Sequence, residues 1–244
     1  MSRLLERHEV LPSTQDRAHA LAEAGAAEGT AVVTTRQTSG RGTRGRRWDS
    51  GPGGLWLSVI GRPPEADRLE RLSVRVGLLA AAAIERVAGL PADRIQLKWP
   101  NDLLLSGRKL GGILSEARWH GEQPAWVVVG VGINVRNQLP GEPLQPAARL
   151  AELDEALEAE ALVEPVVAAV VEALGRRGEL TAEELARFAD RDWLAGRRVA
   201  TPVPGTILGL RPDGRLAVKR DDGSIVAGSP NLTWTDLAPE PGSR

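Results

Sequence analysis

The sequence predicts an α+β protein, in which a larger domain of sheet and flanking helices is followed by a small β-module. Short β-branched segments alternate with Ala- and Leu-rich segments of helical spacing through most of the chain, whereas the residues beyond 196 form short strand-like segments separated by turn sequences. A chain of 244 residues has room for one large domain and a small one. We therefore expect one domain over residues 1–193 and a β-module over residues 194–244.

The first third of the chain is expected to contain two helices and two strands. They lie, in order, at residues 15–26 (helix), 31–36 and 55–60 (strands) and 69–88 (helix). Ser13 and Thr14 follow Pro12 and are residue types that cap helices, which favours a helix start at this point. The second helix is Ala-rich, and Gly89 and Pro91 end it.

The middle of the chain predicts several strands and then a helical region. The strands are expected over residues 95–99, 103–105, 112–118 and 125–135. Gly130 and Gly132 interrupt the last of these, and glycines inside a strand indicate that another backbone or a ligand comes close. Residues 150–189 are rich in Glu and Ala and are expected to be helical, with breaks near Pro165 and at residues 175–178.

The C-terminal segment predicts a small SH3-like β-barrel. Its strands are expected over residues 197–201, 206–210, 215–219 and 224–227. Pro-Asp-Gly at 212–214 and Asp-Asp-Gly at 221–223 are strong hairpin signals. Because about fifty residues bury little core of their own, we expect this module to pack against the larger domain.

The composition indicates a soluble, cytoplasmic protein. The sequence is 42% hydrophobic and 26% charged with a net charge of −1, and it has no apolar run of membrane length and no signal-peptide pattern. A near-neutral charge argues against a dedicated nucleic-acid binder. The absence of cysteine excludes disulfides, thiolate catalysis and cysteine-ligated metals, and the three histidines show no metal-site spacing.

The most informative segment is the loop at residues 39–48, which reads SGRGTRGRRW. Glycine lets backbone N–H groups approach a ligand closely, and arginine supplies permanently charged forks that suit carboxylate and phosphate. The segment therefore predicts a mobile loop that binds anions. A disordered basic linker or a nucleic-acid patch is the alternative that the segment leaves open when it is considered by itself.

Three further motifs stand out, at residues 98–102 (KWPND), 108–114 (RKLGGIL) and 130–134 (GVGIN). Each also has a purely structural interpretation. Pro-Asn-Asp is a common turn, a lysine at a strand edge is usually solvated, and Gly-X-Gly is weak evidence for nucleotide binding.

Taken together, and in this order, the motifs resemble those of the biotin protein ligases. The resemblance rests on STQ at 13–15, QTSGRG at 37–42 and the three motifs above, and it extends over nearly the whole chain, including the C-terminal β-module. It implies the biotin/lipoate-ligase-like catalytic fold, with a mixed sheet and flanking helices.

The resemblance also implies a two-step acyl transfer. Biotin attacks the α-phosphate of ATP, with Mg²⁺, to give biotinoyl-5′-adenylate, which then acylates a lysine of a biotin carboxyl-carrier domain of a carboxylase. The first step joins two anions, so it needs fixed cations and oriented donors more than a nucleophile.

By motif matching, the resemblance implies a role for each of a set of residues. Lys109 and Arg41 would be catalytic. The biotin site would comprise Ser13, Thr14, Gln15, Gln37, Gly40, Arg41, Gly42, Thr43, Lys109 and Gly112. ATP would be bound by Arg44, Arg46, Trp48, Asn101 and Asn134. Asn101 and Asn134 would help to hold ATP together with its metal, and no separate metal-ligating residues are expected.

Some features depart from the family pattern. Thr43 stands where the family usually has a second arginine of Gly-Arg-Gly-Arg, so either Arg44 takes over with a shifted loop or the adenylate is released more readily. Many bacterial relatives begin with a DNA-binding domain, for which we expect no room here, and so no repressor role. A homodimer formed through sheet edges is possible within the family.

Two alternative functions are weighed against biotin ligation. A lipoate ligase or octanoyl transferase shares the fold class, but octanoyl transferases commonly use a cysteine that this chain lacks. RNA-binding RGG segments are usually repeated and interleaved with aromatic residues, whereas the basic run here is single and lies between two predicted strands.

Overall fold

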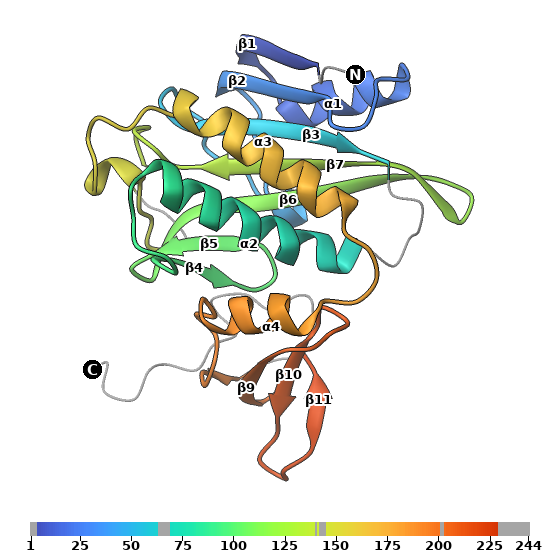
Figure 1. The fold of residues 1–244 in the computed structure, drawn as a ribbon, viewed down its shortest axis with the longest axis vertical. Helices are drawn as coiled ribbons and strands as arrows, with labels where there is room; N and C mark the ends of the chain where they lie inside the picture. The colour runs from blue at the N-terminus through green and yellow to red at the C-terminus, as the bar shows by residue number, and fades with distance from the viewer. Residues whose placement is uncertain (1–3, 63–68, 140, 142–144, 201–202, 229–244) are drawn as a thin grey trace.

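A seven-stranded sheet in the order β1-β2-β3-β7-β6-β5-β4 forms the centre of the larger domain (Figure 1). The computed structural model describes the chain except for residues 1–3, 63–68, 140, 142–144, 201–202 and 229–244. The strands are β1 (Leu5–Leu11), β2 (Ala31–Gln37), β3 (Leu55–Gly61), β4 (Ile95–Lys98), β5 (Asp102–Leu105), β6 (Arg108–His120) and β7 (Gln123–Ile133). Only β1 and β2 pair in parallel, and the other neighbours are antiparallel, so the sheet is mixed.

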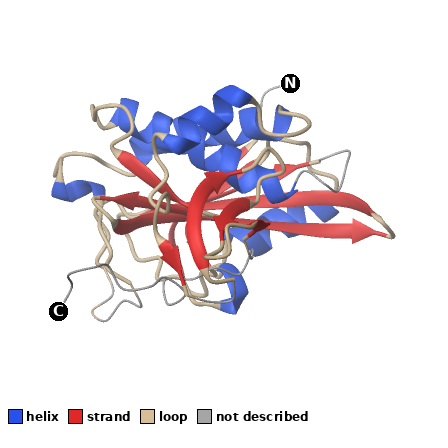
Figure 2. Cartoon of the chain, turned by 90° about the horizontal axis from the view of Figure 1, so that it is seen from below, coloured by secondary structure: helices blue, strands red, loops and turns tan. Residues whose placement is uncertain are grey.

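Helices cover both faces of this sheet (Figure 2). The α-helices of the described residues are α1 (Thr14–Glu23), α2 (Leu69–Val87), α3 (Glu160–Gly175) and α4 (Ala182–Ala189). Ala18 and Ala22 of α1 pack with Ile60 of β3 in a small apolar cluster, whereas Val59 belongs to the larger cluster that includes α2 and α3. Because successive strand residues point to opposite faces, α1 covers one face of the sheet, and α2 and α3 cover the other.

The predicted break at Pro165 is wrong. Helix α3 continues through Pro165 to Gly175, although proline removes one backbone hydrogen bond. Leu162, Val163 and Val166 around the proline are buried in the core, and this packing holds the helix together. The break after residue 175 is confirmed, but residues 153–159 are not α-helical and residues 150–152 form a 3-10 turn.

Strand β1 was not predicted. Its sequence, LERHEVL, carries charged side chains at exposed positions of an edge strand, so it lacks the apolar pattern of a buried strand. The predicted helix start is confirmed, with Ser13 at the N-cap position in extended backbone conformation, but the Ser13 side chain makes no capping hydrogen bond. Instead, Gln37 of β2 accepts from the backbone N–H of Thr14 at 2.8 Å.

The C-terminal module is a four-stranded antiparallel sheet in the order β11-β10-β9-β8. Its strands are β8 (Arg198–Val199), β9 (Gly205–Leu210), β10 (Leu216–Lys219) and β11 (Ile225–Ala227). The predicted hairpin turns lie between these strands. Barrel closure stays a prediction, because residues 229–244 lie outside the described part of the chain.

This small sheet packs against the larger domain, as expected. Ile207, Leu216 and Val218 belong to the same apolar cluster as the core of the larger sheet. The Trp99 indole N–H, at the end of β4, donates to the Gly214 carbonyl at 2.9 Å. The division of the chain at residue 193 therefore stays a prediction, since the core is continuous across it. Within the described ranges, no helix has the length and apolarity needed to cross a bilayer.

Candidate functional site

A pocket of about 440 Å³ lies between the start of α1, the loop joining β2 to β3, and strands β3, β6 and β7. This volume is in the range of small-molecule sites. The pocket brings together nearly all the residues that the sequence predicted. Those lining it are Ser13, Thr14, Gln15, Gln37, Arg41, Gly42, Thr43, Arg46, Trp48, Asn101, Lys109, Gly112 and Asn134. Gly40 and Arg44 are not among the lining residues.

One end of the pocket is polar and neutral. The Thr14 backbone N–H and hydroxyl both donate to Gln37 Oε1, at 2.8 and 3.1 Å, and the Ser58 hydroxyl donates to Thr14 Oγ1 at 2.8 Å. Gln37 Nε2 donates to Ser50 at 2.8 Å, which fixes the amide orientation. Ser13 Oγ is buried and has no hydrogen-bond partner in the described part of the chain. This end offers a ligand both donors and acceptors.

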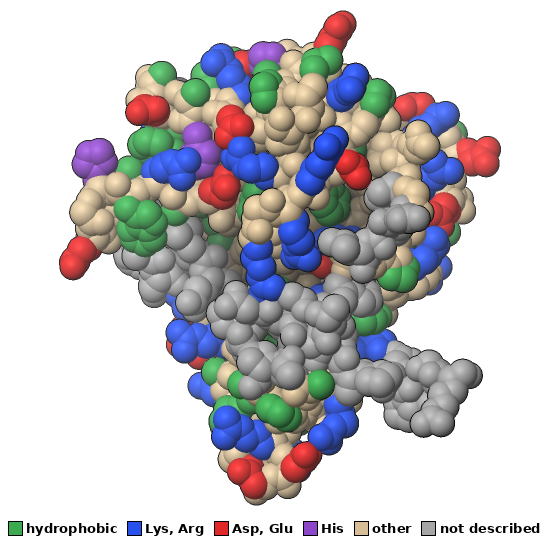
Figure 3. Space-filling view, turned by 180° about the vertical axis from the view of Figure 1, so that it is seen from behind, with side chains coloured by type: hydrophobic (Ala, Val, Ile, Leu, Met, Phe, Trp, Pro, Cys, Tyr) green, Lys and Arg blue, Asp and Glu red, His purple; other side chains and the backbone are tan. Residues whose placement is uncertain are grey.

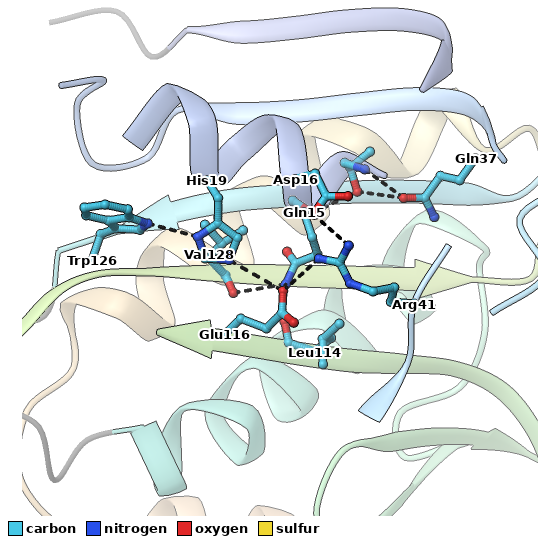
Figure 4. A network of polar contacts seen from close by, with 11 residues as sticks. Gln15, Asp16, His19, Gln37, Arg41, Leu114, Glu116, Trp126 and Val128 are labelled. Atoms are coloured by element: carbon cyan, nitrogen blue, oxygen red, sulfur yellow. Dashed lines mark hydrogen bonds and ion pairs between the residues drawn. The ribbon is translucent and has the colours of Figure 1, made fainter. Parts of the chain in front are cut away.

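A charged network lies beside this polar end (Figure 4). The Arg41 guanidinium donates to Asp16 Oδ1 at 2.7 Å and to Glu116 Oε2 at 3.2 Å. Gln15 Nε2 donates to the same Glu116 oxygen at 3.1 Å. His19 Nε2 lies 3.5 Å from this oxygen. Arg41 thus pairs with two carboxylates, and these contacts connect the loop to α1 and β6.

Glu116 is the anion at the centre of this network. Its contact with His19 lowers the pKa of the carboxyl, burial raises it, and the Arg41 guanidinium lowers it again, which brings the pKa of Glu116 to about 2. The side chain is therefore charged at neutral pH. Neither Glu116 nor Asp16 was singled out from the sequence. Glu116 lies two and four residues after Leu114 and Gly112, so strand alternation, which places all three on one face, is the signal that could have found it.

Lys109 and Trp48 form another part of the pocket lining, beside Gly112. Lys109 Nζ lies 2.7 Å from Asp102 Oδ1 and 5.1 Å from the centre of the Trp48 ring. The Trp48 ring meets Trp56 edge-on, with ring centres 6.5 Å apart. Its indole nitrogen is buried without a hydrogen-bond partner among the described residues. A Cβ added to Gly132 would lie 3.0 Å from this nitrogen, so the close approach predicted at Gly132 is made by Trp48.

The loop places its residues unevenly around the pocket. A Cβ on Gly40 would lie 2.5 Å from both Ser50 Oγ and the Trp48 carbonyl, so glycine is needed there to close the loop base. Arg44 is exposed and adopts φ +61°, in the left-handed region. Thr43 accepts from Arg46 Nη2 at 3.1 Å through its hydroxyl. In this conformation Arg44 does not occupy the place of Thr43 at the pocket.

The two asparagines predicted to contact ATP also hold the backbone. Asn101 Nδ2 donates to the Ile113 carbonyl at 2.8 Å, and Asn134 Nδ2 donates to the Ala148 carbonyl at 3.1 Å. Asn134 Oδ1 accepts from Asn137 at 3.1 Å. Gln145 and Ala147 were not predicted, and they reach the pocket because residue 147 forms a β-bridge with Lys109.

Cationic side chains gather around the pocket. Lys109, Arg41, Arg46 and Arg47 all line it. Lys and Arg side chains are also prominent near the centre of the face drawn in Figure 3. In the described part of the chain, no three His, Cys, Asp or Glu side chains come together as a metal-binding group.

The fold and the pocket together define a class: an α+β protein whose small-molecule site combines a neutral polar end with a cationic wall. Residues 8–134 match the model of the biotin/lipoate A/B protein ligase family, and the chain belongs to this family.

Individual relatives agree with this membership. The chain is 42% identical over 144 residues to the bifunctional ligase/repressor BirA of Bacillus subtilis. The aligned region covers 58% of this chain and 43% of that protein. It is 30% identical over 215 residues to the biotin–[acetyl-CoA-carboxylase] ligase of Mycobacterium tuberculosis, covering 82% of this chain and 76% of that protein. Thus the match spans less than half of the BirA relative.

A solved structure is similar over almost the entire chain. The biotin protein ligase from Aquifex aeolicus in complex with biotin and ATP superimposes with a TM-score of 0.79 at 28% identity. The alignment covers 97% of this chain and 98% of that one.

Proposed function

We propose that this chain is an ATP-dependent ligase that activates biotin as biotinoyl-5′-adenylate and transfers it to a lysine of a biotin carboxyl-carrier domain of the acetyl-CoA carboxylase type. The observation that carries the proposal is one pocket whose lining combines a neutral donor-and-acceptor end with the cationic side chain of Lys109. A bicyclic urea with a carboxylate tail needs this pairing. The names of the relatives and of the solved structure support the same substrates.

In the first step, a carboxylate oxygen of biotin bonds to the α-phosphorus of ATP, and the bond from that phosphorus to the pyrophosphate oxygen breaks. Lys109 would neutralise the charge that gathers on the carboxyl and α-phosphate oxygens. Asp102 holds the ammonium group at 2.7 Å, so Lys109 is oriented before the substrates arrive. Mg²⁺ would enter as part of the MgATP substrate, because ATP phosphates and water supply most of its usual ligands.

In the second step, the amine of the carrier lysine attacks the biotin carbonyl, the bond to the phosphate breaks, and AMP leaves. The adenylate must be shielded from water between the steps. The loop would shield it, with Trp48 against adenine, as the family resemblance implies. A catalytic contribution of Arg41 stays a prediction, since its guanidinium is engaged by Asp16 and Glu116.

Lipoate or octanoate ligation is the alternative substrate assignment, because the family model includes lipoate ligases. Ser13 Oγ and Gln15 Oε1 are buried without a hydrogen-bond partner among the described residues, which favours a urea over an unbranched acyl chain, because the acyl chain would leave both atoms unpaired. A nucleic-acid role is less favoured, because the loop is a wall of the pocket.

The proposed activity is tested by incubating the purified chain with MgATP, biotin and a carboxyl-carrier domain, and measuring the carrier by mass spectrometry. We expect the carrier to gain one biotinoyl group, and a carrier whose acceptor lysine is changed to arginine to gain none. No gain with biotin, together with a gain with lipoate or octanoate, would assign the alternative substrate.

A homodimer and a cytoplasmic location stay predictions. If two copies join through a sheet edge, β1 is the better candidate. The outer side of β4 is occupied, because the Leu97 N–H donates to the Arg191 carbonyl at 2.8 Å and the Trp193 N–H donates to the Leu97 carbonyl at 3.0 Å.

A further inference from the structure

The side-chain amide of Gln15 has its orientation fixed by its neighbours. Its nitrogen donates to the Leu114 carbonyl at 3.3 Å, to Glu116 Oε2 at 3.1 Å and to the Val128 carbonyl at 3.5 Å. All three partners are acceptors, so the nitrogen must face them. Gln15 Oε1 is then left buried, without a hydrogen-bond partner in the described part of the chain, and beside Gly130 in the pocket wall.

Glu116 is the charged partner of this amide among the described contacts, and the His19 ring lies beside it. The Trp126 indole N–H donates to His19 Nδ1 at 3.0 Å. His19 Nδ1 is therefore an acceptor, and the ring proton lies on Nε2, which faces Glu116 Oε2 at 3.5 Å. The Glu116 oxygen thus receives donors from α1 and from the loop at one point (Figure 4).

We propose that Glu116 is a positioning residue for ligand selection: by binding the Gln15 amide nitrogen, it leaves the Gln15 oxygen as the acceptor that this wall offers to an N–H of the ligand. The proposal rests on the proposed function, in which the ligand is biotin and the N–H belongs to its ureido ring. The same Glu116 oxygen also accepts a hydrogen bond from Arg41. One carboxylate therefore contacts both the residue that would recognise the ureido ring and the loop at residues 39–48. Asp16 also binds Arg41, but no hydrogen bond from Asp16 to Gln15 is found among the described contacts.

The test compares the dissociation constants of two ligands by calorimetry without ATP: biotin, and an analogue in which oxygen replaces the ring N–H. In the wild type, the analogue places an oxygen against a buried acceptor, so we expect biotin to be preferred by about 5- to 150-fold. Each of the two ring nitrogens is replaced by oxygen in turn, and the analogue that loses more affinity for the wild type is used as the comparison ligand.

Four variants separate positioning from general damage. Gln15→Leu removes the acceptor, and we expect its preference for biotin to fall to about 3-fold or less. Glu116→Met removes the charged partner of Gln15 and is expected to lower the preference for biotin at least about 5-fold. Glu116→Gln retains an acceptor for the Gln15 nitrogen, so its preference for biotin is expected to stay within about 3-fold of the wild-type value. Glu172→Met, an exposed site on α3, is the matched control and is expected to change nothing.

A structural defect would weaken both ligands equally and leave their ratio unchanged, so a wild-type ratio in Gln15→Leu or in Glu116→Met would overturn the proposal. The side chain of Glu116 is 30% exposed, so we expect Glu116→Met to fold; if its melt is not cooperative, Glu116→Ala replaces it under the same criterion. Failure of the wild type to bind biotin at all would count against the proposed function. This outcome is distinguishable from failure of the Glu116 proposal, in which the wild type binds biotin but the variants keep its preference.

Discussion

Replacing Lys109 with methionine is expected to slow formation of the acyl-adenylate by about 10²- to 10³-fold, as removal of one preorganised charge-stabilising donor does elsewhere. Lys109 is the lysine of the pocket wall, and Asp102 orients it at 2.7 Å. Methionine retains an unbranched apolar stem but removes the ammonium group, which lies 5.1 Å from the centre of the Trp48 ring. Single-turnover formation of adenylate from biotin and MgATP, followed by quenching and chromatography, gives the rate directly.

Two controls belong with this measurement. Arg108→Met changes the neighbouring cation, which pairs with Glu152 at 2.5 Å and does not line the pocket, and is expected to retain the wild-type rate. Lys109→Met leaves Asp102 without its partner, so the double variant with Asp102→Asn checks that the slow rate is not caused by that unpaired charge. A rate within about 3-fold of wild type in Lys109→Met would remove Lys109 from the mechanism.

Replacing Glu184 with glutamine is expected to lower the free energy of unfolding by about 3 kcal/mol at pH 7, and by progressively less in acid. Glu184 is buried and receives the Arg75 Nε–H at 2.9 Å, which joins α4 to α2. Burial raises the pKa of Glu184, but hydrogen bonds from Arg75, the Thr181 backbone N–H and Arg176 lower it by more. The net effect is a pKa of about 2, compared with an ordinary value of 4.5.

The unfolded chain therefore binds this proton more readily than the folded chain. The contribution of Glu184 is fully present above pH 4.5 and is lost as the pH falls toward about 2. Urea unfolding of wild type and Glu184→Gln at pH 7, 4.5 and 3 checks this. Glu183→Gln, an exposed neighbour in the same helical turn, is expected to stay within about 0.5 kcal/mol of wild type. A difference between wild type and Glu184→Gln that is the same at every pH would contradict the account.

Much of the site could be predicted because its residues lie in short motifs with distinctive chemistry. The loop at residues 39–48 and the lysine at 109 combine residue types that neither a helix nor an ordinary strand favours. They converge because β6 and β7 pair across Gly112 and Gly132, which brings motifs far apart in sequence to one pocket.

The parts that were missed depend on tertiary contacts. Strand β1 is held by pairing with β2 rather than by an apolar pattern, and α3 tolerates Pro165 because its flanks are buried. Glu116 looks like an ordinary solvated residue in the sequence, and only the meeting of α1, the loop and β6 makes it the shared anion of the network.

The central claim is that this pocket activates biotin, and ATP–pyrophosphate exchange with labelled pyrophosphate tests it most directly. The account predicts rapid exchange in the presence of biotin, and background exchange with no acid or with lipoate or octanoate in its place. Exchange that is independent of biotin, or that is supported by lipoate or octanoate but not by biotin, would contradict it.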